Sequence, residues 1–177
     1  MTLISFMRLV SANLPRLFLI ALWGLVCVLI LAAPIGKAQD CSTAAGFVYL
    51  VFAPVCHQLP ERSFTLWEYP WAVCQRCSGI YLGLFAGALF HRRAFEKLVR
   101  PSARRSVVVG MTLPLMLDVM LPFTGVWTNG PPSRFATGFL FGAMLSLLLV
   151  PGVSEFLREA PWKQAHVNAP HTQGGAS

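Results

Sequence analysis

Long apolar segments alternate with short polar ones along this chain. Residues 17–33, 78–90, 106–126 and 135–151 are almost free of charged side chains. A helix of about 20 apolar residues crosses the hydrocarbon core of a membrane. The pattern therefore predicts an all-α, polytopic membrane protein with about four transmembrane helices.

A further apolar run, residues 44–55, is short. As a helix it would be about 18 Å long, against about 30 Å for the hydrocarbon core. We therefore expect a re-entrant or interfacial helix, which Pro54 helps to end. The polar, aromatic-rich stretch from Cys56 to Arg76 is then interpreted as a surface loop lying on the membrane.

The same pattern suggests three parts. Residues 1–43 would form an N-terminal anchor helix with an external linker, because the apolar run at 17–33 is long for a cleaved signal peptide. Residues 44–151 would form a membrane domain that contains the cysteine and histidine motifs. Residues 152–177 would form a cytoplasmic tail, partly disordered because its end is polar and rich in small residues.

Composition agrees with a lipid environment. The chain is 55% hydrophobic and only 12% charged, so a water-soluble fold would leave too much apolar surface exposed. The formal net charge is +7, but the basic residues flank the apolar runs, which indicates the lipid bilayer as partner and no nucleic acid.

Charge also predicts the orientation. Loop 91–105 carries six Lys or Arg residues and one acid, so it should be cytoplasmic, as should both termini. This places the chain in the inner (cytoplasmic) membrane as a multi-pass protein. If segment 44–55 does not cross, the cysteine motifs and the polar residues near 118–134 all lie on the outer side.

Small residues recur every four positions in two of the apolar runs. The two series are Gly79, Gly83 and Gly87, and Gly138, Gly142 and Ser146. Residues with this spacing share one face of a helix and let a second membrane helix approach closely. The faces predict helix packing, either within the chain or in a homo- or hetero-oligomer.

A Cys/His cluster is the main candidate for chemistry. Cys74 and Cys77 form a C-x-x-C pair, and Cys56 and His57 precede it in the same polar stretch. Thiolates and imidazole are good ligands for a borderline-soft ion such as zinc, and four of them suit a tetrahedral site. We expect Cys56, Cys74 and Cys77 as ligands, with His57 or water as the fourth.

Other interpretations of these cysteines remain open. With Cys41 the outer side has an even number of cysteines, which could form structural disulfides. The C-x-x-C pair is also the spacing of a membrane thiol–disulfide oxidoreductase, in which Arg76 would lower a thiol pKa. The pattern predicts no particular enzymatic activity.

Asp118 is a second candidate, because a carboxylate within an apolar run is costly unless it is paired. Arg76, Arg134 or a bound metal could pair with it, and Asn129 lies on the same predicted side. If Asp118 instead faced a polar cavity, it would favour a small transporter or a transporter accessory subunit.

The motifs resemble a known family. Residues 56–63 (CHQLPERS) and 74–83 (CQRCSGIYLG), followed by Asp118, Asn129 and residues 134–138 (RFATG), are similar to the pattern of a family of small bacterial and archaeal predicted membrane proteins of unknown function. The resemblance covers about residues 47–150. It groups these residues together and implies no particular reaction.

Overall fold

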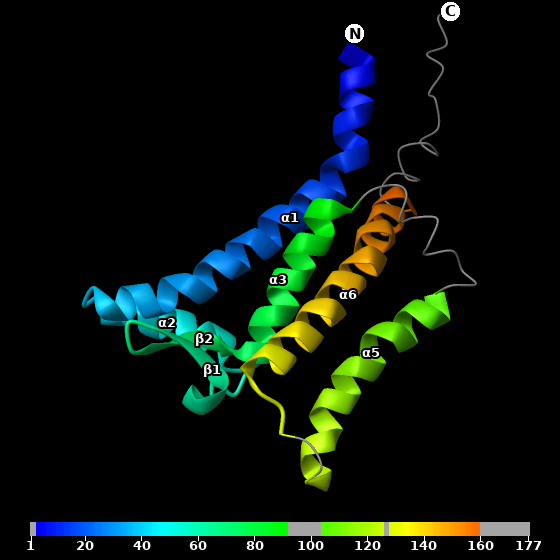
Figure 1. Ribbon diagram of the computed structural model, residues 1–177. Helices are drawn as coiled ribbons and strands as arrows, with labels where there is room; N and C mark the ends of the chain where they lie inside the picture. Colours follow the sequence, from blue (N-terminus) through cyan, green and yellow to red (C-terminus); the bar gives the residue numbers. More distant parts are fainter. Residues whose placement is uncertain (1–2, 92–103, 126–127, 160–177) are drawn as a thin grey trace, which may run out of the picture.

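The computed structural model describes residues 3–91, 104–125 and 128–159. These residues are mainly helical (Figure 1). The helices are α1 (Leu3–Ala38), α2 (Ser42–Phe52), α3 (Gln75–Phe90), α5 (Arg104–Met120) and α6 (Pro131–Glu159). Two short 3-10 helices, η1 (Pro60–Arg62) and η2 (Leu121–Thr124), adjoin β1 and α5.

Helix α3 lies between α1 and α6, and α5 packs on the far side of α6 (Figure 1). The contact between α3 and α6 is unusually close. A Cβ atom at Gly83 would overlap the carbonyl oxygen of Phe139, and one at Gly142 would overlap that of Ile80. The two series of small residues therefore pack against each other within one chain, which confirms the helix packing predicted from their spacing. An oligomer through the same faces would have to compete with this contact.

In the part of the chain that the structure describes, three helices, rather than the predicted four, are long and apolar enough to cross a membrane. Among the described residues these segments are Asn13–Ala38, Ser106–Thr124 and Pro131–Phe156. The predicted count was too high by one helix, α3. It has 16 residues, so it is about 24 Å long, and its first turn contains the polar Gln75 and Arg76. Its length is therefore less than that of a full hydrocarbon core.

The predicted helix at residues 44–55 is observed as α2, but the all-α prediction is wrong for the segment that follows. The expected surface loop contains an antiparallel hairpin of β1 (Ser63–Leu66) and β2 (Tyr69–Cys74). Its two-residue turn, Trp67 and Glu68, has φ angles of 49° and 69°. Such turns normally contain Asn or Gly, so the sequence lacks the usual hairpin signal, although aromatic residues favour strands.

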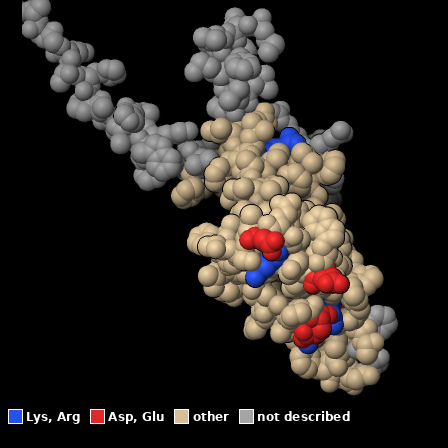
Figure 2. All heavy atoms as spheres, turned by 90° about the vertical axis from the view of Figure 1, so that its left-hand side faces the viewer, with Lys and Arg blue, Asp and Glu red and all other residues tan. Residues whose placement is uncertain are grey.

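The face of the molecule in Figure 2 is mostly uncharged. Its acidic side chains gather from mid-height downward, toward the end where α2 and the hairpin lie in Figure 1. Large apolar side chains such as Phe18, Val28 and Leu50 are more than half exposed. A surface of this kind is stable in lipid and would aggregate in water.

The two ends of the helix bundle differ. At one end Arg16 of α1 donates hydrogen bonds to the last carbonyls of α3, with Nε 3.0 Å from Ala88 O and Nη2 2.7 Å from Leu89 O. A cation here also compensates the negative end of the α3 dipole. The opposite end contains α2, the hairpin and the starts of α3 and α6 (Figure 1). This end brings together the cysteine motifs and the polar residues near Asp118.

Candidate metal centre

Three cysteines meet where the hairpin joins α3. The sulfur atoms of Cys56, Cys74 and Cys77 all lie within 4.8 Å of one another. Cys74 ends β2 and is the N-cap of α3, Cys77 lies in the first turn of that helix, and Cys56 follows α2. Cys56 is buried, and the other two are half-buried. The prediction that these three cysteines come together is confirmed by the geometry.

Local structure explains this convergence. Cys74 has extended backbone angles (φ −68°, ψ 163°) and the helix begins at the next residue, so the first turn brings Cys77 back toward it. The amide N–H of Cys74 donates a hydrogen bond of 3.2 Å to the Cys56 sulfur. This bond ties the loop that carries Cys56 to the end of β2.

Gln58 braces the loop that carries Cys56. Its backbone is left-handed, with a φ of 52°. The side-chain amide nitrogen donates to the carbonyl oxygens of Tyr49, at 2.7 Å, and Ala72, at 2.8 Å. Because Tyr49 belongs to α2 and Ala72 to β2, a single side chain holds the loop between these two elements.

The pKa values of the Cys74 and Cys77 thiols are shifted in opposite directions. Hydrogen bonds with Cys56 and Cys77 lower the pKa of the Cys74 thiol. The bonds with Cys56 and Cys74, together with burial, raise the pKa of the Cys77 thiol. The cluster thus favours a Cys74 thiolate surrounded by donor thiols. A cation that replaced those protons would allow all three sulfurs to act as thiolate ligands.

The spacing of the sulfurs suits a metal. With zinc–sulfur bonds of about 2.3 Å, a tetrahedral site places its ligand sulfurs about 3.8 Å apart. The observed limit of 4.8 Å requires only a small closure of the cluster. The three cysteines could therefore hold a metal ion. Of the four predicted ligands, His57 is not part of this group, and its side chain is exposed. Cys41 is exposed and also lies outside the cluster.

A polar network lies beside the cysteines. Asp118 of α5 forms an ion pair with Arg76 of α3, and the two side chains are 5% and 24% exposed. Asn129 donates to the backbone oxygen of Asp118 at 2.7 Å and to its Oδ2 at 3.4 Å. The carboxylate is therefore paired, as its position in an apolar segment requires. Among the predicted partners, Arg76 is the residue in direct contact.

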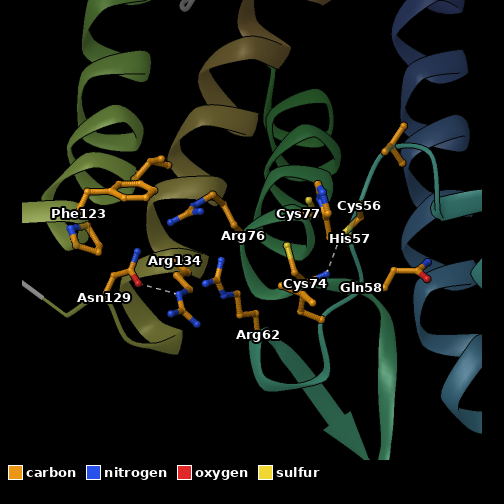
Figure 3. Close-up of a pocket in the computed structure, with 14 residues that line it drawn as sticks. Cys56, His57, Gln58, Arg62, Cys74, Arg76, Cys77, Phe123, Asn129 and Arg134 are labelled. Carbon is orange, nitrogen blue, oxygen red and sulfur yellow. Dashed lines mark hydrogen bonds between the residues drawn. The ribbon is translucent and has the colours of Figure 1, made fainter.

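Arg134 extends this network to two further elements. Its Nε donates to Asn129 Oδ1 at 3.0 Å (Figure 3), and its Nη1 donates to Gln75 Oε1 at 3.3 Å. The Gln75 amide in turn donates to Ser63 O at 3.4 Å. Hydrogen bonds thus connect α5, α6, α3 and β1 around the start of α3.

A pocket of about 590 Å³ separates the cysteine cluster from the end of α5 (Figure 3). Its wall includes Cys56, Cys74 and Cys77 on one side and Asn129 and Arg134 on the other. Three further polar residues at this site were not predicted from the sequence: Gln58, Arg62 and Gln75. Their position inside the two cysteine motifs is the signal that could have indicated them.

Comparisons with known proteins agree with the motifs. A family model described as a predicted membrane protein (DUF2085) matches residues 56–148, more than half of the 177-residue chain. An uncharacterized protein of Methanocaldococcus jannaschii is 28% identical over 106 residues, covering 59% of this chain and 67% of the relative. An uncharacterized protein of Methanothermobacter thermautotrophicus is 32% identical over 102 residues, covering 57% of this chain and 89% of the relative. No solved structure matches the chain. With its cysteine motifs inside the matched segment, the chain belongs to this family of predicted membrane proteins.

Proposed function

We propose that the protein is a membrane metal-binding protein in which Cys56, Cys74 and Cys77 hold a zinc-like ion. The observation that carries the proposal is the convergence of three sulfurs within 4.8 Å from two separate segments of the chain. A redox pair or a single disulfide needs only two thiols. A third buried thiol at the same point is explained by coordination.

Zinc fits the donors better than a hard cation does. Thiolates select borderline-soft and soft ions, whereas magnesium and calcium prefer oxygen ligands. Three protein ligands leave the fourth position of a tetrahedral ion available on the side of the pocket. Water or the His57 imidazole, which also lines the pocket, would occupy that position. We propose metal binding as the function of the site and assign no reaction to it.

We further propose that the site lies on the outer side of the inner membrane, with both termini in the cytoplasm. Support comes from the charge of the sequence, since ten of the fourteen basic residues fall on the predicted cytoplasmic side. Three spans alone would leave the termini on opposite sides, so this orientation requires the short helix α3 to return the chain across the membrane as well. The ends of α3 agree with this, because it begins at Cys74 and its last carbonyls accept hydrogen bonds from Arg16, on the predicted cytoplasmic side.

The direct test is metal content. The full chain, purified in detergent without added metal or chelator, should contain about one zinc per chain, as one three-cysteine cluster implies. Cys74→Ser should lose the metal. Cys41→Ser is the matched control, because this exposed cysteine lies outside the cluster. Absence of stoichiometric metal from the wild-type protein, or equal metal content in Cys74→Ser, contradicts the proposal.

A thiol–disulfide oxidoreductase is the second candidate. The observation that favours it is Cys74 at the start of α3, with its pKa lowered by the neighbouring thiols, since a thiolate is the attacking species in exchange. The two candidates predict different responses. A chelator should expose thiols if the site holds metal, whereas only a reductant should do so if the site is oxidised. Transport is less well supported, because Asp118 is paired with Arg76 and does not line this pocket.

A further inference from the structure

The pocket beside the cysteines carries excess positive charge. Three arginines line it, Arg62, Arg76 and Arg134, and the lining residues include no carboxylate. Figure 3 shows these side chains on the wall between the cysteines and Asn129. Among the described residues, Asp118 makes an ion pair with Arg76 only. Among the described residues Arg62 and Arg134 thus make no ion pair with a carboxylate, and their two charges exceed the single net negative charge of a divalent ion held by three thiolates.

Two of these arginines are held in place while keeping hydrogen-bond capacity. Arg134 donates to Asn129 and Gln75, both neutral acceptors, at 3.0 Å and 3.3 Å. A guanidinium has five N–H donors, so further donors remain for a ligand. The buried Nε of Arg76 has no hydrogen-bond partner among the described residues. Fixed donors of this kind bind an anion without a large ordering cost.

The start of α3 adds to the positive potential. Arg76 and Cys77 of its first turn line the pocket, and their backbone N–H groups also interact with the Cys74 sulfur. The first backbone N–H groups of a helix have no partner within the helix, and the helix dipole is positive at this end. Helix starts bind phosphate groups for this reason.

We propose that this pocket binds a phosphate group, with Arg62, Arg76 and Arg134 as its ligands. A phosphate monoester carries close to two negative charges and several acceptor oxygens, which suits the donors of the two arginines that make no ion pair. The pocket is larger than a phosphate ion, at about 590 Å³, and its remaining wall includes apolar residues such as Val55, Leu59 and Phe123. The side chain of Phe123 is 84% exposed. The expected ligand therefore has a phosphate group and an organic part that the rest of the pocket can hold. A lipid headgroup and a water-soluble phosphate compound both meet this description.

The test is a binding titration on the full chain in maltoside micelles, which contain no phosphate. One arm adds inorganic phosphate, and the other adds short-chain phosphatidic acid, with the diacylglycerol of the same chains as control. Saturable binding and a rise in the unfolding midpoint are expected in at least one arm. Binding only to phosphatidic acid indicates a lipid ligand, and binding to inorganic phosphate indicates a water-soluble one.

Arginine variants decide whether the pocket is responsible. Arg62→Gln should weaken binding at least about tenfold, because a charge-assisted hydrogen bond is worth more than one power of ten in affinity. Arg62 is exposed, so the variant should fold, and Arg134→Gln provides a second measurement. Lys37→Gln removes the same charge from the end of α1, outside the pocket. No binding in either arm, or equal losses for Arg62→Gln and Lys37→Gln, overturns the proposal. The titration does not measure metal content, so its failure would leave the metal site untouched.

Discussion

Replacement of Gly83 by alanine tests how closely α3 and α6 must pack to form the site. The added Cβ would overlap the carbonyl oxygen of Phe139 and would lie 2.8 Å from the backbone nitrogen of Ala143. Both atoms belong to the main chain of α6, so no side-chain rotation can relieve the overlap. The helices must move apart, and this separation also strains the 3.3 Å bond from Arg134 to Gln75.

The size of the effect follows from two opposing terms. Overpacking a close contact costs about 1–3 kcal/mol, whereas alanine is favoured over glycine within a helix by about 1 kcal/mol. Gly110→Ala is the matched control, because Gly110 lies inside α5 and a Cβ there would meet nothing within 4 Å. It gains the helix propensity without the overlap. The two variants should therefore differ in free energy of unfolding by about 1–3 kcal/mol.

Unfolding in mixed micelles with increasing SDS, followed by circular dichroism, measures this difference. We expect Gly83→Ala to unfold at a lower SDS fraction than the wild type, and Gly110→Ala at an equal or higher one. If Gly83→Ala is as stable as Gly110→Ala, the close approach of α3 and α6 is incorrect. The placement of the cysteines relative to Arg134 would then also need revision.

Three further predictions concern the surroundings of the site. Asp118→Asn leaves the Arg76 guanidinium without a counter-charge and should lower the free energy of unfolding by about 2–3 kcal/mol. This loss is smaller than for a fully buried pair because Arg76 is 24% exposed. Asp118→Glu should lose less, and equal stability of Asp118→Asn and wild type in SDS unfolding would refute the pairing. Gln58→Leu removes two hydrogen bonds to backbone oxygens and should lower the free energy of unfolding by about 1–3 kcal/mol. Cys56 should then react faster with a thiol reagent, and an unchanged labelling rate would contradict the role of Gln58 in holding the loop. A reporter active only outside the cytoplasm should be active when fused after Trp67 and silent when fused after Val99, and the reverse pattern would contradict the proposed orientation.

Sequence patterns predicted the helices where hydrophobicity was sustained. The spans in α1, α5 and α6 contain long apolar windows, and the small-residue spacing indicated the α3–α6 contact. The hairpin was missed because its turn uses Trp67 and Glu68 in a conformation that is normally marked by Gly or Asn. The run at residues 78–90 was counted as a span, but α3 has only 16 residues even though its polar first turn, assigned to the preceding loop, belongs to the helix.

The site was predictable as a group of residues but not as a set of contacts. Motif spacing indicated Cys56, Cys74 and Cys77, since a C-x-x-C at a helix start turns both sulfurs toward one point. The partner of Asp118 depended on how α5 packs relative to α3, which periodicity does not define. The pocket likewise depends on the distance between the hairpin loop and the start of α6. The division into parts at residues 43/44 and 151/152 remains a prediction.

X-ray absorption at the zinc edge of the purified full chain identifies the atoms that surround the metal. We expect three sulfur neighbours at about 2.3 Å and one oxygen or nitrogen neighbour at about 2.0 Å. The signal should be the same in Cys41→Ser, and Cys77→Ser should lose one sulfur neighbour or the metal itself. A metal surrounded only by oxygen and nitrogen, or a sulfur count unchanged in Cys77→Ser, would show that the three cysteines do not form the metal centre.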